Sequence, residues 1–273
     1  MGILVFDTAG GLCNQFYDVL CGVNFAIQYK LQFTFRYCMT RSINMKQAKK
    51  LEMHELFDMK YFKTLPHYVE YETIKSDMHL ENTYNIRGRP CHVLLNGNKN
   101  IHKQITDIQK KYIVLSFFHT IHKFQNITLM LYKKLLPAPA IMQKYMEIKK
   151  LIGLENGKYN YIHYRYEPDF INHFQIKNPL TLCNVLNKAK FEDTTCKTYI
   201  ACSNTGSQLK GCSQTVLDNI LYKPEDCLGE LGYEECAFID FMIGKYSKEV
   251  YGNRRSSFSG VLNAMHQTTN YYC

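Results

Sequence analysis

The chain has 273 residues, of which 46% are hydrophobic and 21% charged, and its net charge is +9. This length suits one large domain or two of about 130 residues, with enough apolar residues for a real core. The basic residues form scattered pairs and no long run, which argues against a nucleic-acid-binding tail. No apolar stretch reaches the roughly 18 residues that span a membrane, so we expect a soluble chain with no membrane span.

The N-terminus, MGILVFDTAGG, has neither a positively charged leader nor a cleavage site, so it is not expected to be a signal peptide. Of the eleven cysteines, no two are spaced as CxxC, and zinc-site spacing is therefore absent. We expect mostly reduced thiols. If the protein is secreted, disulfides stay open among Cys196, Cys202, Cys212, Cys227 and Cys236.

Strand and helix patterns alternate along the chain. Short apolar runs predict strands, and apolar residues at helical spacing predict helices. In the first half, strands are predicted at 3–6, 31–38, 91–95 and 112–118, and helices at 14–28 and 138–152. In the second half, strands are predicted at 159–166, 197–203 and 248–253, helices at 181–190, 235–246 and 258–267, and a helix or loop at 213–222.

A polar turn, LENGK at 154–158, separates two alternating sets of elements. Beta-alpha-beta spacing implies parallel sheets covered by helices. We therefore predict an α/β protein of two Rossmann-like domains facing a cleft, with an N-terminal domain over 1–155 and a C-terminal domain over 156–273. Ligands of open parallel sheets bind beyond the carboxyl ends of the strands, and the site is expected there.

The first candidate segment is a glycine turn after the first strand, Gly10-Gly11-Leu12-Cys13-Asn14-Gln15. Paired glycines let the backbone turn sharply and approach a ligand. The helix that follows directs N–H groups outward, which suits an anion or a hydroxyl-rich group. The turn matches neither GxGxxG nor a Walker A loop. A purely structural strand-to-helix turn explains it equally well.

The second candidate segment is HYRYEPD at 163–169, at the end of an apolar strand. Alternation puts His163, Arg165 and Glu167 on one side of the strand and two tyrosines on the other. The planar guanidinium of Arg165 can hold two phosphate oxygens, with His163 as a further donor. One alternative is an internal ion pair of Arg165 with Glu167 or Asp169. A divalent metal at the two carboxylates is weaker, because Arg165 would compete for them.

The third candidate segment combines Asp240, on a predicted helix, with YGNRRSSF further along the chain. Ser256 and Ser257 open a helix and offer hydroxyl and backbone N–H groups to an anion. Asp240 could accept hydrogen bonds from the edge of a nucleobase. The alternative is a structural helix residue that pairs with Lys245 or Arg254.

Together the three segments resemble the O-fucosyltransferase group of glycosyltransferases, which includes protein O-fucosyltransferases and their plant relatives. GGLCNQ resembles the group's glycine-asparagine-glutamine turn, and YIHYRYEPDF resembles its apolar strand followed by His-x-Arg-x-Glu/Asp. ELGYEECAFIDFMIGKYSKEVYGNRRSSFSG resembles its C-terminal stretch, in which an Asp-containing helix leads to a strand and a Ser-Ser-Phe turn. Order and rough spacing agree over nearly the whole chain.

The resemblance implies a GT-B fold and an inverting, metal-independent enzyme that moves a sugar from a nucleotide-sugar donor to a hydroxyl of a glycan or protein. By position, Arg165 would hold the donor diphosphate and stabilise the leaving group. Gly11 and Asn14 would approach the sugar and the acceptor, and Asp240 would bind the base. The implied catalytic residues are Arg165, Asn14 and Asp18, and the implied donor-binding residues are Gly10, Gly11, His163, Asp240, Ser256, Ser257 and Phe258.

The general base is open, because some relatives carry a Glu in the glycine turn where this chain has AGGL. Asp18, one helical turn after Asn14, and Asp7, just before the turn, are candidates. Either can also be a structural carboxylate. Activation of the acceptor by hydrogen bonds, without a dedicated base, is a further alternative.

The donor is open as well. GDP-fucose is the family default, and a UDP-sugar such as UDP-xylose is the alternative, as is a non-catalytic nucleotide- or glycan-binding module. The chain is shorter than typical members and lacks their stem and signal, so we expect a cytoplasmic protein encoded by a microbe or a large virus. We expect no metal, no cofactor beyond the nucleotide sugar and no nucleic-acid partner.

Overall fold

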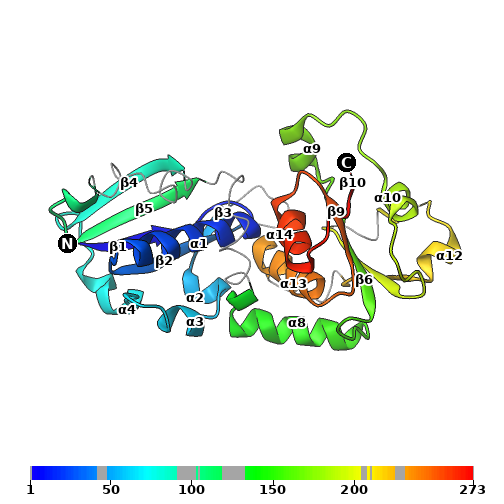
Figure 1. Cartoon of the computed structure of the whole chain (residues 1–273), viewed down its shortest axis with the longest axis horizontal. Coiled ribbons are helices and arrows are strands. Elements are labelled where there is room, and N and C mark those ends of the chain that lie inside the picture. Colours follow the sequence, from blue (N-terminus) through cyan, green and yellow to red (C-terminus); the bar gives the residue numbers. More distant parts are fainter. Residues whose placement is uncertain are drawn as a thin grey trace. The chain divides into compact units, whose positions relative to one another are not determined.

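A computed structural model of the chain describes residues 2–41, 48–90, 103, 105–118, 133–203, 208–209, 211–224 and 231–272. Internal contacts divide the chain into two compact units, which we call unit 1 (Met1–Ala140 with Gly232–Glu235) and unit 2 (Ile141–Leu231 with Cys236–Cys273). Figure 1 labels their elements. The domain boundary between residues 155 and 156 stays a prediction, and the strand predicted at 91–95 lies outside the described residues.

Unit 1 is built on a five-stranded sheet with the order β3-β2-β1-β5-β4. Its strands are β1 (Ile3–Asp7), β2 (Phe33–Arg41), β3 (Ala48–Glu52), β4 (Thr83–Pro90) and β5 (Tyr112–Phe118). All pairings are parallel except that of β3 with β2. The central strand β1 is apolar on both faces, and Leu4, Val5 and Phe6 are fully buried, as the middle strand of a covered parallel sheet requires.

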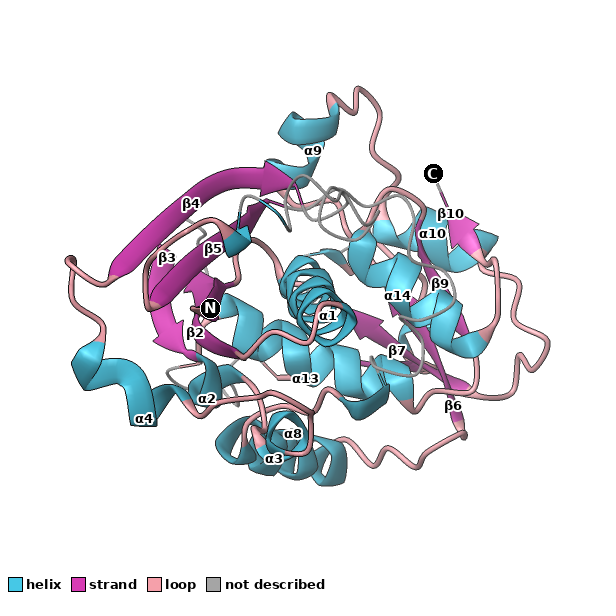
Figure 2. Ribbon diagram, turned by 60° about the vertical axis from the view of Figure 1, so that its left-hand side comes forward, coloured by secondary structure: helices cyan, strands magenta, loops and turns pink. Residues whose placement is uncertain are grey.

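Helices cover both faces of this sheet. On one face lies α1 (Leu12–Gln28), which Figures 1 and 2 show beside the sheet. Gly22 of this helix lies against the ring of Phe6. On the other face, Val5 packs in a cluster with Ile74. The short helices of unit 1 are α2 (Met53–Leu56), α3 (Lys60–Lys63), α4 (Tyr71–Ile74) and the 3-10 helix η1 (Lys75–Asp77).

Unit 2 is built on a second five-stranded sheet, with the order β10-β9-β6-β7-β8 and all pairings parallel. Its strands are β6 (Tyr159–His163), β7 (Lys197–Ala201), β8 (Ile220–Leu221), β9 (Val250–Asn253) and β10 (Tyr271–Tyr272). Because the strands are parallel, their carboxyl ends lie at one edge of the sheet. His163 and Asn253, the last residues of β6 and β9, therefore lie at that edge.

Strand alternation decides which helices face which side chains in unit 2. The Tyr159 hydroxyl donates to the carbonyl of Ile243 in α13 (Tyr233–Lys245) at 2.7 Å, and Tyr161 lies against Gly244. On the opposite face, Ile162 packs in a cluster with Leu182 of α10 (Leu182–Lys188). The other described helices after residue 138 are α8 (Pro139–Leu151), α9 (Pro168–Phe174), α12 (Gln214–Leu217) and α14 (Ser257–His266).

Three predicted strands are shorter than expected: β7 ends at Ala201, β9 begins only at Val250, and β6 ends early. The strand predicted over 159–166 ends at His163, so that Arg165 follows β6 in an irregular segment that leads to α9. Beyond His163 the backbone N–H of Arg165 bonds to the Tyr272 hydroxyl instead of a neighbouring strand, and Pro168 then occupies the first position of α9. The α/β class with two Rossmann-like sheets is confirmed.

The cysteines are divided between one disulfide and free thiols. Cys183 of α10 is bonded to Cys212, and Cys183 was not among the residues for which a disulfide stayed open. Within the described residues, the free thiols include Cys13, Cys21, Cys38 and Cys196. In the part of the chain that the structure describes, no helix is both long and apolar enough to cross a membrane.

Candidate functional site

His163 lies at the carboxyl edge of the unit 2 sheet, on the side that α14 covers. Its ring stacks on Phe258 with 4.4 Å between the ring centroids, and its side chain is almost completely buried. Burial, together with the smaller effect of the positive charges of Arg165 and Lys223, lowers the pKa of His163 to about 3. The imidazole is therefore neutral at physiological pH.

A serine of α14 fixes the His163 ring. The Ser259 Oγ lies 2.8 Å from Nδ1 of His163 and accepts the backbone N–H of Asn253 at 3.0 Å. Since Oγ already accepts that N–H, its own hydrogen can point to Nδ1 of the neutral ring. This assignment leaves the imidazole hydrogen on Nε2, where it can be donated to a ligand.

Arg165 follows two residues after the end of β6 and forms the ion pair that the sequence offered as an alternative. Its Nη1 lies 2.5 Å from Oε2 of Glu167, with side-chain exposures of 14% and 11%. The guanidinium carbon also lies 5.4 Å from the centre of the Phe170 ring. The pair involves one nitrogen of a group that has five N–H donors. Tyr164 and Tyr166 are buried in the core of unit 2.

The Ser-Ser-Phe turn opens α14 immediately after β9. Ser256 is the N-cap residue and has no side-chain capping bond to the helix, while Ser257 is its first helical residue. Backbone N–H groups at a helix N-terminus carry a partial positive charge suited to anions. Phe258 lies between two aromatic rings, since it stacks on His163 and meets Phe241 edge-on at 5.6 Å. The Ser-Ser-Phe turn is therefore in direct contact with His163, through Phe258.

Asp240 is buried in α13 and has two partners in unit 2. Its Oδ1 accepts the Tyr199 hydroxyl at 2.7 Å, and its Oδ2 pairs with the Lys223 ammonium. Its salt-bridge partner is therefore Lys223, and not Lys245 or Arg254. Both side chains are buried, so that removing either one would leave the other as an unpaired buried charge. Burial raises the pKa of Tyr199 well above its usual range, and the neighbouring Asp240 carboxylate adds to this effect.

In unit 1, the glycine turn is held by Gln15. Gly10 has a φ of 82°, which favours glycine, and Gly11 is the N-cap of α1. The Gln15 side chain donates to the carbonyls of Gly10 (3.0 Å) and Met39 (2.7 Å). The Oδ1 of Asn14 is buried and has no hydrogen-bond partner among the described residues, the condition of a polar group that awaits a ligand or water.

The two carboxylates proposed as general bases are both engaged in structural interactions. Asp18 is fully buried, and its Oδ2 accepts the backbone N–H of Ala9 at 3.0 Å. Asp7 receives two hydrogen bonds from the guanidinium of Arg36, at 3.0 and 2.6 Å. This geometry favours the structural alternative for both residues.

Three residues of this region, Lys223, Ser259 and Tyr272, were not predicted from the sequence. Each contacts a partner that is distant in the sequence and is brought close only by the fold of unit 2. The only local signals were the position of Lys223 shortly after a strand and that of Ser259 in the first turn of α14. Among the described residues, no group of three or more His, Cys, Asp or Glu side chains is arranged to hold a metal ion.

Two units with Rossmann-like parallel sheets and covering helices define a fold of the GT-B class, in its O-fucosyltransferase-like form. Solved structures of two fucosyltransferases, POFUT1 and NodZ, have the same fold. The crystal structure of POFUT1 in complex with GDP-fucose aligns with 99% of this chain and 97% of its own, with a TM-score of 0.63 and 12% identity. The fucosyltransferase NodZ from Bradyrhizobium aligns with 96% of this chain and 92% of its own, with a TM-score of 0.62 and 11% identity.

A third structure, of NodZ alpha-1,6-fucosyltransferase soaked with GDP-fucose, has a TM-score of 0.58 at 10% identity and covers 97% of this chain and 93% of its own. At such low identity the likeness establishes the fold, which agrees with the fold that the three sequence segments implied. No protein-family model and no curated protein sequence matches the chain.

Proposed function

We propose that the protein is a glycosyltransferase that uses a nucleotide-sugar donor and holds it at the carboxyl edge of the unit 2 sheet. One observation carries the proposal: Arg165, His163 and the start of α14 with Phe258 gather where β6 and β9 end. In parallel sheets this edge is the usual place for a nucleotide. The fold supports the same function, because one POFUT1 structure of this fold is a complex with GDP-fucose and one NodZ structure comes from a crystal soaked with GDP-fucose.

The donor diphosphate would be bound by groups of three kinds. The Arg165 guanidinium offers a planar fork to the phosphate oxygens. Neutral His163 offers a hydrogen-bond donor at Nε2 without a charge. Ser256 and Ser257 offer hydroxyl and backbone N–H groups at the N-terminus of α14.

The proposed reaction is a direct displacement at the anomeric carbon with inversion. The acceptor hydroxyl oxygen forms the new bond to that carbon, and the bond from the carbon to the phosphate oxygen breaks. The electron pair stays on the diphosphate, and the acceptor hydroxyl loses its proton. Arg165 and the α14 N-terminus would stabilise the charge on the leaving diphosphate in place of a metal ion. In unit 1, the Oδ1 of Asn14 would accept a hydrogen bond from the sugar or the acceptor.

The donor base and sugar belong to the proposal in two versions. GDP-fucose is favoured because POFUT1, which has this fold, was solved in complex with it. A UDP-sugar such as UDP-xylose is the second version, since Asp240 already has Lys223 and Tyr199 as partners and its base preference can differ. Thermal shifts measured with GDP, UDP, CDP and dTDP would identify the base.

A second candidate function is a nucleotide- or glycan-binding module without catalysis. The observation that favours it is the engagement of Asp7 by Arg36 and of Asp18 by Ala9, which gives neither carboxylate the exposed position that a general base needs. If a nucleoside diphosphate stabilises the purified protein and no donor ever loses its sugar, this second candidate is supported.

The first prediction tests Arg165. We expect Arg165→Ala to lower the rate of nucleoside diphosphate release from the donor by about 100- to 1000-fold, the usual effect of removing one group that stabilises transition-state charge. Arg165→Lys should recover little, because an ammonium cannot replace the planar fork. The rate would be measured as donor hydrolysis, which needs no knowledge of the acceptor.

The matched control is Lys158→Ala, which removes a cation from the surface of the same unit, where Lys158 is 72% exposed in an ion pair with Glu155. It should leave the rate unchanged. A wild-type rate in Arg165→Ala would exclude the proposed role of that residue.

A further inference from the structure

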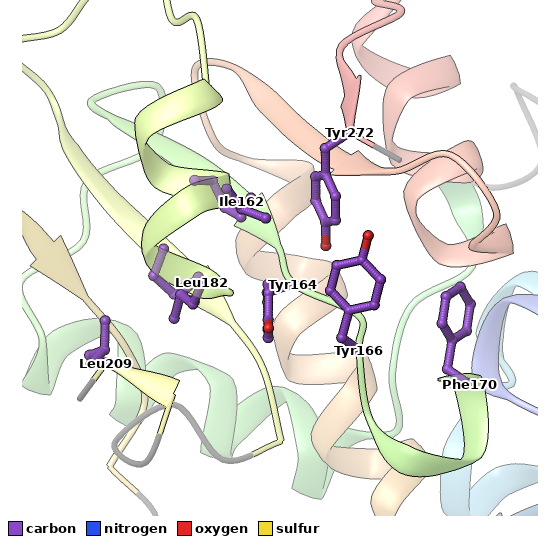
Figure 3. Packing of buried hydrophobic residues seen from close by; sticks show 9 residues of the cluster. Ile162, Tyr164, Tyr166, Phe170, Leu182, Leu209 and Tyr272 are labelled. Carbon is purple, nitrogen blue, oxygen red and sulfur yellow. The ribbon is translucent and has the colours of Figure 1, made fainter. Parts of the chain in front are cut away.

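Tyr272, near the C-terminal end of the chain, lies in the core of unit 2 next to the Arg165 segment. Its side chain is 3% exposed, and its ring lies 5.8 Å from that of Tyr166. Figure 3 shows Tyr272 reaching from β10 toward Tyr164 and Tyr166, in the cluster that also contains Phe170. A tyrosine in such a core needs partners for its hydroxyl group.

Both partners of the hydroxyl are backbone groups that flank Tyr164. The hydroxyl donates to the carbonyl of His163 at 2.7 Å and accepts the backbone N–H of Arg165 at 2.9 Å. A single oxygen atom thus bridges the last residue of β6 and the residue two positions later.

This bridge lies where the hydrogen bonds between β6 and its neighbouring strands come to an end. The N–H of Tyr164 still bonds to the carbonyl of Ala201 in β7 at 3.0 Å, but β6 itself ends at His163. The Tyr272 hydroxyl takes over the N–H of Arg165, and the Asn253 side chain donates to the carbonyl of Arg165 at 3.4 Å. The backbone of Arg165 is therefore held at both its polar groups, by side chains from β10 and β9.

We propose that Tyr272 is a positioning residue, whose hydroxyl fixes the backbone of Arg165 and so directs the guanidinium at the donor diphosphate. This inference rests on the function proposed above. Long side chains bind well only when their backbone is fixed, since a shift of about 1 Å can cost a large factor in rate. Tyr272 would not touch the donor. It acts through Arg165.

The alternative is that Tyr272 only fills the core. Its ring contacts Tyr166 and Tyr251 and would do so without a hydroxyl. Tyr272→Phe separates the two roles, because it keeps the ring and removes only the oxygen. The matched control is Tyr159→Phe, which removes another buried hydroxyl from the same unit, one that donates to the Ile243 carbonyl at 2.7 Å.

The test compares both variants with wild type for the binding of a nucleoside diphosphate (GDP or UDP, whichever binds more tightly) and of the matching nucleoside. In Tyr272→Phe we expect about tenfold weaker diphosphate binding, because Arg165 is no longer held in position for the phosphates, with nucleoside binding unchanged. Donor hydrolysis should fall in parallel. Tyr159→Phe should bind both ligands as wild type does.

Equal diphosphate affinities in the two variants would overturn the role of Tyr272. Failure of the proposed function gives a different result, since wild type itself would then bind no nucleoside diphosphate. Exchange of the Arg165 amide hydrogen in the wild type is a third readout, independent of ligands and of whether Tyr272→Phe folds. Slow exchange, comparable with the Tyr161 amide inside β6, supports the bridge. Fast exchange overturns it.

Discussion

At the scale of single residues, the burial of His163 determines what the site can do. A neutral imidazole beside Arg165 avoids repulsion between two cations, and it still provides a hydrogen bond to an anion. Ser259 selects the ring nitrogen that does so, because it occupies Nδ1. The arrangement makes His163 a fixed donor whose function does not depend on protonation near neutral pH.

Burial of His163 also makes stability depend on pH. The pKa of His163 is about 3 in the folded chain, against an ordinary value of 6.5 that applies on unfolding. Between these values the unfolded state binds a proton that the folded state does not, so stability is lost as the pH falls below 6.5. We expect this group alone to cost about 2 kcal/mol of unfolding free energy at pH 5, relative to pH 8.

The measurement is urea unfolding at pH 5 and pH 8 in wild type and in His163→Asn. The variant has no ionisable group at this position, so its loss of stability on acidification should be smaller than that of wild type by that amount. His54→Asn, which changes a histidine whose side chain is 62% exposed, serves as the control. Its loss of stability between pH 8 and pH 5 should equal that of wild type. Identical pH dependence in wild type and His163→Asn would show that the ring titrates normally.

At the scale of elements, the close packing of β9 on α14 holds the site together. A methyl group added at Gly252 would lie 2.5 Å from Cβ and Oγ of Ser259, which is far too close. Gly252 therefore lets α14 approach the strand, and this approach brings Ser259 to His163. A glycine in a strand that another backbone approaches closely is a recognised pattern.

Two glycine substitutions test this packing. Gly252→Ala should destabilise the protein by about 1–3 kcal/mol, because the core must move to admit the methyl group. Gly260→Ala, in α14, should stabilise it by up to about 1 kcal/mol, since nothing lies within 4 Å of the added carbon and alanine favours the helix. Denaturant unfolding measures both. A Gly252→Ala variant as stable as wild type would contradict the close packing.

The sequence predicted the apolar elements best. β1, α1, β5 and α14 carry strong periodic patterns, and the structure has them within a few residues of the prediction. β3 and β10 were missed for physical reasons. Three residues of β3 are exposed, so it has no apolar pattern, and its place depends on antiparallel pairing with β2. β10 has two residues, too few for a pattern, and is defined by its pairing with β9.

The candidate site was predictable in its motifs and not in its partners. The end of β9 was predicted, and the segment after β6 was identified although that strand was predicted three residues too long, because glycine and serine turns and charged residues after an apolar run are local signals. The residue that bridges the Arg165 segment, Tyr272, is separated from His163 by 109 positions, and such a partner follows only from the folded sheet. Lys223 was not predicted for the same reason, since it follows β8 and its partner Asp240 lies in α13.

At the scale of the whole molecule, the two units have different proposed roles. Unit 2 carries the groups suited to a diphosphate, and unit 1 carries the glycine turn with the buried Oδ1 of Asn14. Binding of a nucleotide without its sugar should therefore affect unit 2 alone. Each unit has a buried core of its own, so protection on ligand binding can be assigned to one or the other.

Hydrogen exchange on the full chain tests this division. With a nucleoside diphosphate bound, we expect slower exchange in 163–170 and 252–260, because these segments contain the groups that would hold the phosphates. The glycine turn at 10–14 should not change. With the intact nucleotide sugar, that turn should also become protected, since Asn14 would then meet the sugar. Protection of the glycine turn by the nucleoside diphosphate alone, with 163–170 unaffected, would show that the phosphates bind to unit 1 and that the assignment is reversed.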